Sequence, residues 1–399
     1  MSDSTNDPLL RWRSEFPILE TSTYLVNHSL GAMPRKTFDA LHEYADMWAT
    51  RGIRAWAEGW WSSPVDTGNL LARIFDAPEN SVVMHQNVSV IQGLLASCFD
   101  FEAPRNRVVY TGMNFPTVMY VWEAQRRRGA EIVEVPSRDG VGVETEDLLA
   151  AIDERTLLVP VSHVLFQTGY QQDARAIIER AHEVGALVVL DCYQSTGTVP
   201  FSVRELDVDM VCGGSVKWLC GGPGAGYLYV KPELRETLEP GITGWCAHAE
   251  PFAFEPGPIR YADDATRMLH GSPAVPALYA ARSGYEIVAE IGVDAIREKS
   301  VRQTSWLLDA ALARGFSTKS PLDASKRGGT VTVEVEQAPA VVKALAAREI
   351  LLDCRPDVGL RVSPHFYTSD DDLAHFLDEL EDIVKTGAWK QHASEAAAY

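Results

Sequence analysis

Short apolar runs rich in β-branched residues recur between about residues 65 and 265, and amphipathic stretches separate them. Runs of about four to eight such residues are typical of buried strands, whereas the spacing of apolar positions in the intervening stretches is typical of helices. This alternation predicts strand–helix–strand units on a mostly parallel sheet, an α/β fold. The strand candidates are SVVMH, RVVYTG, AEIVEVP, TLLVPVSHVLF, ALVVLDC, DMVCGGS and GAGYLYV, and the helix candidates are VSVIQGLLASCFD, PTVMYVWEAQRRRG and DARAIIERAHEVG.

The pattern changes after about residue 270, where long helical stretches alternate with fewer strands. The runs GGTVTVEVE and GLRVSPHFY predict a small antiparallel sheet, and the helical stretches around them predict a smaller C-terminal α+β domain. An isolated extended piece near the start, TYLVNHSLGAMP, is predicted to join this smaller domain. We therefore expect an N-terminal segment (1–45) that joins the small domain, a large α/β domain (46–268) and the small domain itself (269–399).

Composition narrows the range of partners. The chain has 399 residues, of which 46% are hydrophobic, so it can bury a large core. Its net charge of −19 argues against nucleic acids and anionic membrane surfaces as partners. Its six cysteines have no paired spacing, which favours reduced thiols in a cytoplasmic protein over disulfides or a bound metal. The polar start predicts no signal peptide, and the lack of a long apolar run predicts no membrane span.

Candidate chemistry lies in two neighbouring segments. The run ALVVLDC places an acid, Asp191, at the end of a predicted strand, and the Gly/Ser-rich stretch GGSVKWLCGGPGAG places Lys217 shortly after it. Ligands of parallel sheets bind beyond the carboxyl ends of the strands, where Asp191 falls. An acid and a lysine in this order suit pyridoxal phosphate, because the lysine amine can form a Schiff base and the carboxylate can keep the pyridine nitrogen protonated. Glycines near the lysine let the backbone approach a planar cofactor.

Both residues also have simpler interpretations. Asp191 could cap the helix that follows its strand, and Lys217 could be a solvated lysine on a glycine loop. Such loops also bind the phosphates of nucleotides, but neither G-x-x-x-x-G-K-[ST] nor a well-placed G-x-G-x-x-G occurs in this sequence. The order of strand, acid and lysine therefore favours a pyridoxal phosphate site.

A series of further strings resembles motifs of the class V aminotransferases, a branch of the fold-type-I pyridoxal phosphate enzymes, and those of kynureninase most closely. The resemblance runs nearly from end to end. It implies a large domain with a mostly parallel sheet and a smaller C-terminal α+β domain, as the hydrophobic pattern does. The strings, in order, are YLVNHSLGAMP, IRAWAEGWWSSP, NFPT, SHVLFQTG, GWCAHAEPFAF and LRVSPHFYTSDDDL.

The resemblance implies roles for individual residues. Lys217 would carry the Schiff base and Asp191 would pair with the pyridine nitrogen, so these two are the implied catalytic residues. Phe115 would stack on the pyridine ring, and Arg361 would hold the substrate carboxylate in a bidentate fork. The other implied cofactor-binding residues are Asn87, Val88 and Ser89 at a helix start, Ser162, Gln194, Ser215, and Trp245 and Ser272 from the partner subunit; the other implied substrate-binding residues are His28 and Ser29.

Structural alternatives exist for several of these residues. Phe115 could be a core residue at the start of a helix, and Ser89 could be an ordinary helix cap. Arg361 could belong to a structural ion pair. Trp245 and Ser272 could be plain interface residues.

Three positions depart from the kynureninase pattern. The family usually has an aspartate where this chain has Val118, a histidine where it has Gln194, and a tyrosine where it has Val216. In the family the tyrosine binds the cofactor phosphate and is a proposed proton donor in the cleavage step. Gln194 instead resembles the cysteine desulfurases of class V, in which the amide contacts the phenolic oxygen of the cofactor. These departures weigh against kynurenine itself as the substrate.

The sequence thus predicts a pyridoxal phosphate enzyme that acts on an α-amino acid through Lys217. The leading hypothesis is a kynureninase-like hydrolytic cleavage of Cβ–Cγ that releases alanine, or a close variant on a bulky amino acid. The alternatives are a class V aminotransferase, a desulfurase or C–S lyase that works by β-elimination, and a non-catalytic binding homologue. The family resemblance also implies a homodimer with composite active sites, in which Trp245 and Ser272 close the neighbour's site.

Overall fold

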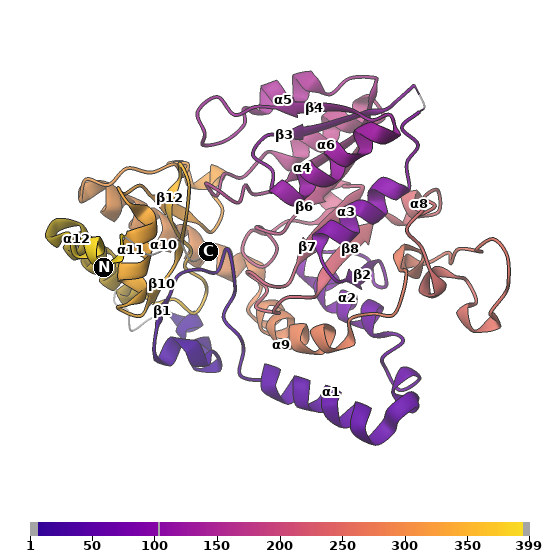
Figure 1. Ribbon diagram of the computed structural model, residues 1–399, viewed down its shortest axis with the longest axis horizontal. Coiled ribbons are helices and arrows are strands. Elements are labelled where there is room, and N and C mark those ends of the chain that lie inside the picture. Colours follow the sequence, from indigo (N-terminus) through magenta and orange to yellow (C-terminus); the bar gives the residue numbers. More distant parts are fainter. Residues whose placement is uncertain (1–6, 103, 394–399) are drawn as a thin grey trace.

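A seven-stranded sheet forms the centre of the computed structural model, which describes residues 7–102 and 104–393 (Figure 1). The strand order is β2-β8-β7-β6-β5-β3-β4. Strands β3 to β7 pair in parallel, whereas β8 is antiparallel to both β7 and β2. The predicted α/β class with a mostly parallel sheet is therefore confirmed. The strands are β2 (Val82–His85), β3 (Arg107–Thr111), β4 (Glu131–Val135), β5 (Thr156–Ser162), β6 (Leu187–Asp191), β7 (Met210–Gly214) and β8 (Gly226–Val230).

Helices cover both faces of this sheet, which explains why most of its strands are apolar runs without alternation. The edge strand β4 is the exception, with Glu131 and Glu134. Val188 and Leu190 of β6 pack into one core with helices α2, α6 and α9, whereas Val189 packs into the opposite core with α3 and α4. Polar caps fix the helix starts, since Asn87 accepts the Val90 N–H at the start of α3. These helices are α2 (Ser63–Ile74), α3 (Val88–Ser97), α4 (Pro116–Glu123), α5 (Thr145–Ala151), α6 (Ala174–Glu183), α7 (Val203–Leu206), α8 (Pro232–Arg235) and α9 (Val275–Ile291).

The C-terminal part forms a smaller module beside the large sheet, seen in orange and yellow in Figure 1. Its antiparallel sheet has the order β11-β12-β9, as predicted, with β9 (Val331–Val333), β11 (Asp353–Arg355) and β12 (Gly359–Val362). Helices α10 (Val293–Ala313), α11 (Ala338–Ala346) and α12 (Asp370–Thr386) pack on it around one apolar core. A capping box between Ser369 and Asp372 fixes the start of α12.

The N-terminal segment connects the two parts. Strand β1 (Thr23–Tyr24) pairs in parallel with β10 (Ile350–Leu351), which links this stretch to the small module. The predicted N-terminal segment (1–45) itself stays a prediction. Helix α1 (Thr37–Arg51) packs against α9 and contains the predicted boundary after residue 45. Helix α9, which follows the predicted boundary at residue 268, packs on α2 of the large domain as well as on α1. These contacts cross both predicted boundaries, so the boundaries at residues 45 and 268 stay predictions. No helix is predicted from the sequence at α1, although Leu41, Tyr44, Ala45 and Trp48 follow helical spacing.

Two further features concern the described ranges, 7–102 and 104–393. No helix in them is both long and apolar enough to cross a bilayer. No group of three or more His, Cys, Asp and Glu side chains there is arranged to hold a metal ion.

Candidate active site

A cavity of about 220 Å³ lies at the carboxyl ends of β2, β5 and β6. Ser162 ends β5 and Asp191 ends β6, and the two residues are direct partners in the sheet. The fold thus gathers side chains from segments far apart in the sequence, as expected for this class of sheet. The predicted residues that line the cavity are Asn87, Val88, Ser89, Phe115, Ser162, Asp191, Gln194 and Lys217; Thr117, Val164, Phe166 and Tyr193, to which the sequence assigns no role, complete it.

Lys217 reaches this cavity from the turn that follows β7. Its Nζ atom lies 4.5 Å from the ring centroid of Tyr193 and 5.6 Å from that of Phe115. The N-terminal segment holds the turn in place, because the Gly31 N–H donates to the Val216 carbonyl at 2.7 Å. A Cβ at position 31 would lie 2.0 Å from the Lys217 carbonyl oxygen, so this close approach requires a glycine.

Burial sets the charge of the two catalytic candidates. Desolvation, aided by the positive charge of Arg361 and opposed by Asp191, lowers the pKa of Lys217 to about 7. Desolvation likewise raises the pKa of Asp191 to about 6. Near neutral pH the amine of Lys217 is therefore substantially unprotonated, which is the form that attacks a carbonyl carbon.

This shift predicts how cofactor attachment depends on pH. Because the neutral amine reacts, the rate at which pyridoxal phosphate attaches to the cofactor-free protein should rise about tenfold per pH unit below pH 7 and level off above it. An ordinary lysine would give a rate that still rises beyond pH 9. Stopped-flow absorbance, with Nα-acetyl-lysine measured in parallel to correct for titration of the cofactor, distinguishes the two profiles.

Asp191 uses its two carboxylate oxygens differently. Oδ1 accepts the backbone N–H of Tyr193 at 2.9 Å and so closes a turn. The next helix along the chain, α7, begins at Val203 with Ser202 as its cap, so Asp191 closes this turn rather than capping a helix. Oδ2 has no hydrogen-bond partner within the described part of the chain and lies in a residue that lines the cavity. The carboxylate can therefore cap its turn and also accept a proton-bearing nitrogen from a ligand.

The opposite end of the cavity suits an anion. The N–H groups of Val88 and Ser89 open helix α3 and donate to no acceptor in residues 7–102 and 104–393. The hydroxyls of Ser89 and Thr117 lie 3.4 Å apart, so the starts of α3 and α4 meet here. Free N–H groups and hydroxyls at helix starts are suited to a phosphate. Together with Asp191 and Lys217 in the same cavity, this donor set fits pyridoxal phosphate.

Hydrogen bonds on both sides fix the amide of Gln194. Its Nε2 donates to the His28 carbonyl at 3.0 Å, and its Oε1 accepts from the Trp218 indole at 3.0 Å. These bonds orient the side chain and leave its second N–H for a ligand oxygen. Phe115 is 44% exposed and makes an edge contact with Phe166, so it faces the cavity and is no core residue.

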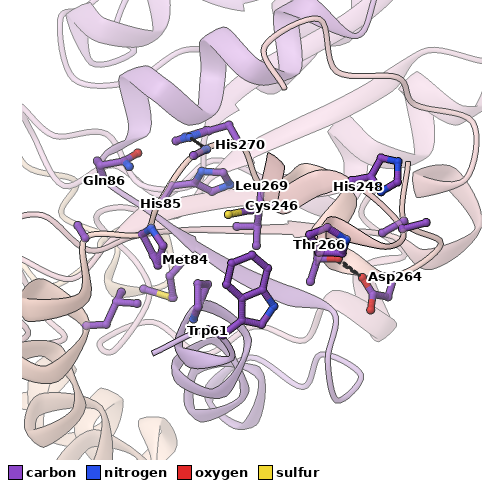
Figure 2. Close-up of a pocket in the computed structure, with 18 residues that line it drawn as sticks. Trp61, Met84, His85, Gln86, Cys246, His248, Asp264, Thr266, Leu269 and His270 are labelled. Carbon is purple, nitrogen blue, oxygen red and sulfur yellow. Dashed lines mark hydrogen bonds between the residues drawn. The ribbon is translucent and has the colours of Figure 1, made fainter. Parts of the chain in front are cut away.

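Three predicted cofactor-binding residues lie outside this cavity. Ser215 is buried behind it, where its hydroxyl contacts the Ala225 carbonyl and the Tyr285 hydroxyl. Trp245 and Ser272 are sequence neighbours of Cys246 and Gly271, which line a second cavity of about 230 Å³. Trp245 packs on Trp61, another residue of that cavity, with ring centroids 5.0 Å apart. The cofactor contacts of these three residues stay predictions. Figure 2 shows the second cavity lined by Trp61, Met84, His85, Gln86, Cys246, His248, Asp264, Thr266, Leu269 and His270.

The predicted substrate residues lie next to the cofactor cavity. Arg361 donates to the Phe166 carbonyl at 2.6 Å and makes a bidentate ion pair with Asp353. The folded chain therefore contains the structural ion pair that the sequence allows as the alternative role of Arg361. His28 contacts the other side of Asp353 at 2.8 Å. Ser29 follows it in a turn that is closed by the Ser29 N–H on the Val26 carbonyl. Substrate contacts by all three stay predictions.

Tyr193 and Phe166 have no role in the sequence-based prediction, although both line the cavity. Tyr193 lies between Asp191 and Gln194 in the run DCYQ, so its position beside the strand end was a usable signal. Phe166 lies four residues beyond the end of β5, and its approach to Phe115 depends on the tertiary fold.

The chain is similar to proteins of one family along most of its length. The model of the family described as aminotransferase class V matches residues 23–368. The uncharacterized aminotransferase YcbU of Bacillus subtilis (strain 168) is 31% identical over 377 residues, which cover 93% of this chain and 96% of that protein. Kynureninase of Bacillus anthracis is 29% identical over 403 residues, which cover 97% of this chain and 94% of that protein.

Solved structures share the fold at lower identity. The apo cysteine desulfurase of Thermococcus onnurineus NA1 superimposes with a TM-score of 0.84 at 20% identity, over 94% of this chain and 98% of that one. The cystine C–S lyase C-DES in complex with cysteine persulfide gives a TM-score of 0.83 at 20% identity, over 92% of this chain and 99% of that one. The family match together with the cavity of Lys217 and Asp191 identifies the cofactor as pyridoxal 5′-phosphate. The chain belongs to the class V aminotransferase family and is a pyridoxal phosphate-dependent enzyme of fold type I.

Proposed function

We propose that this enzyme acts on an aromatic or otherwise bulky α-amino acid in a kynureninase-like reaction or a close variant of it. In the kynureninase-like reaction water adds to a carbonyl at Cγ, the Cβ–Cγ bond breaks, and a carboxylic acid and alanine are released. The observation that carries the proposal is the position of Arg361, whose guanidinium donates to the carbonyl of Phe166 in the cavity wall, next to the aromatic rings around Lys217. Similarity to kynureninase over 97% of the chain supports it.

The residues of the cavity divide the work. Bound pyridoxal phosphate supplies an electron sink that stabilises negative charge at the substrate Cα. Lys217 anchors the cofactor covalently, and its amine, once displaced by the substrate amine, takes the proton from Cα. Asp191 holds a proton at the pyridine nitrogen, and the N–H groups of Val88 and Ser89 bind the phosphate. Phe115 packs on the ring, and Gln194 donates an N–H to a ring substituent.

The six cysteines distinguish this proposal from a desulfurase that forms a persulfide on its own thiol. Such a cysteine needs a low pKa and exposure. Burial instead raises the pKa of all six thiols: Cys98, Cys192, Cys212, Cys220, Cys246 and Cys354. None of them forms a disulfide, in keeping with our proposal of a cytoplasmic location.

We therefore predict that Cys354→Ser, the change at the half-buried thiol nearest the substrate arginine in the sequence, leaves turnover within about twofold of wild type. The thiol is neutral and serves no step of the proposed reaction. Steady-state assays of both proteins on the same substrate check this result. A loss of turnover by orders of magnitude would assign Cys354 a chemical role.

Product analysis tests the proposed function. The holoenzyme is incubated with kynurenine, hydroxykynurenine, L-phenylalanine, cysteine and an amino acid plus α-keto acid pair. We expect aromatic α-amino acids to change the absorbance of the bound cofactor, and we expect alanine release from kynurenine itself to be weak or absent because Val118, Gln194 and Val216 replace the kynureninase residues. Sulfur release from cysteine, or efficient amino transfer to the keto acid, would replace the proposal with the corresponding alternative.

We also propose that the enzyme is a twofold homodimer. Trp245, Phe252 and Phe254 form an aromatic patch whose members are 43%, 61% and 72% exposed. Their rings pack on one another and on Trp61. Exposed aromatic groups of this kind are enriched at protein interfaces, and a second copy of the chain is the occupant that the family resemblance implies.

Light scattering tests this assembly. We predict a dimer for the wild type and a concentration-dependent shift towards monomer for the double change Phe252→Ser and Phe254→Ser, since both rings would leave a buried contact. Leu322→Ser is the matched control, because Leu322 is 69% exposed on a different surface. A monomer that is stable and active in the wild type would contradict the proposal.

A further inference from the structure

Asp353 occupies a central place behind the cofactor cavity. It lies on β11 directly opposite Arg361 on β12, so the two side chains share one face of the small sheet. Its Oδ1 accepts from Arg361 Nε at 2.9 Å and its Oδ2 from Arg361 Nη2 at 2.6 Å. This bidentate pair uses one edge of the guanidinium. Nη1 also donates to the Phe166 carbonyl at 2.6 Å, so one N–H of Nη1 and one N–H of Nη2 remain for a ligand.

Other residues hold Asp353 itself. His28 contacts its Oδ1 at 2.8 Å, and burial lowers the pKa of His28 to about 3, so the imidazole is neutral and donates from Nε2. The other imidazole nitrogen, Nδ1, lies 2.6 Å from the Ser363 hydroxyl, which fixes this orientation. The carbonyl of His28 accepts from Gln194, so the same unit is tied to the cofactor cavity.

The charges of this unit are also balanced. Arg361 is 2% exposed, and Arg355 lies 3.2 Å from Asp353 through its Nη2 atom. With His28 neutral, one carboxylate therefore stands between two guanidinium groups, which leaves a net charge of about +1 for a single anionic group. Arg361 and Arg355 both lower the pKa of Lys217, whereas Asp353 raises it, so the unit lies within electrostatic reach of the reacting amine.

We propose that Asp353, held by His28, is the positioning residue that fixes Arg361 by one edge, so that the N–H groups it leaves on Nη1 and Nη2 face the substrate carboxylate. The inference rests on the proposed function, because it assumes that Arg361 binds that carboxylate. The positioning role and simple electrostatics predict opposite effects of removing the Asp353 charge on carboxylate binding. Removing a negative charge beside Arg361 should strengthen carboxylate binding by electrostatics, but it should weaken binding if the bidentate contact orients the guanidinium.

A pair of ligands measures carboxylate recognition separately from all other contacts. L-Phenylalanine and 2-phenylethylamine differ by the carboxylate, and each is titrated into the holoenzyme while the absorbance of the bound cofactor is recorded. The dissociation constant of 2-phenylethylamine divided by that of L-phenylalanine reports the contribution of the carboxylate, and a larger ratio means stronger recognition. We expect Asp353→Asn to lower this ratio about tenfold or more. An unchanged or higher ratio would overturn the positioning role.

Three further variants complete the test. Arg361→Gln should bring the ratio close to one; a wild-type ratio in this variant would refute the carboxylate role of the proposed function rather than the positioning role alone. His28→Gln, which keeps both charges, should lower the ratio about threefold, and it decides the question if Asp353→Asn does not fold. Asp357→Asn is the matched control, because Asp357 is an exposed acid in the turn between β11 and β12, and its ratio should equal that of wild type.

Discussion

Replacing Lys217 by alanine should reduce turnover by more than about 10³-fold and abolish covalent attachment of the cofactor, without loss of the fold. The lysine is both the anchor and the group that moves the proton at Cα, and no other lysine lines the cavity within the described residues. Removing its buried amine also removes a desolvation cost, so the cofactor-free protein should not lose thermal stability. Turnover assays, visible absorbance and thermal unfolding check the three parts.

Lys231→Ala is the control for this prediction. Lys231 pairs with Asp207 at the opposite end of β8, away from the cavity. Its loss should leave both the cofactor spectrum and turnover at wild-type levels. If Lys217→Ala kept near-normal turnover, the assignment of the active site to this cavity would be wrong.

Asp191→Asn should lower turnover by at least about 10²- to 10³-fold and weaken cofactor retention, because a neutral amide cannot hold the proton at the pyridine nitrogen. The free energy of unfolding of the cofactor-free protein should rise or stay unchanged. Burial raises the pKa of Asp191 to about 6, so at neutral pH its charged form is costly in the folded state, and asparagine lacks that cost. Dialysis against buffer without cofactor, followed by absorbance, measures the retention.

Asp209→Asn provides the comparison for Asp191. Asp209 is also a buried acid of the central sheet, but it precedes β7 and accepts the Val188 N–H at the amino ends of the strands. Its replacement should affect stability and leave the cofactor spectrum unchanged. Equal cofactor loss in both variants would mean that retention reflects the integrity of the sheet rather than the pyridine nitrogen.

The hydrophobic pattern predicts the central sheet well, because its strands are covered by helices on both faces and burial there selects apolar residues. All seven strands of the central sheet lie within the predicted apolar runs. Helix α1 escapes this logic. Its apolar residues follow helical spacing in the sequence, but Phe38 and Trp48 are 60% and 62% exposed in the single chain, so burial within this chain does not account for them.

The candidate site could be predicted where residues lie at strand ends or helix starts, as Asp191, Ser162 and Asn87 do. Contacts that depend on tertiary folding could not. The cross-strand pair of Asp353 and Arg361 requires the register of β11 and β12, and the contact of Gln194 with His28 joins residues far apart in the sequence. A pattern of residue types carries no information about such partners.

The central claim is that Lys217 carries the cofactor, and peptide mapping after chemical reduction tests it most directly. The holoenzyme is treated with sodium borohydride, which makes the linkage between lysine and cofactor permanent, and its peptides are then analysed by mass spectrometry. Our account predicts the added mass of the reduced cofactor on the peptide that contains Lys217. Modification of a different lysine, or none in a protein that is fully loaded with cofactor, would contradict it.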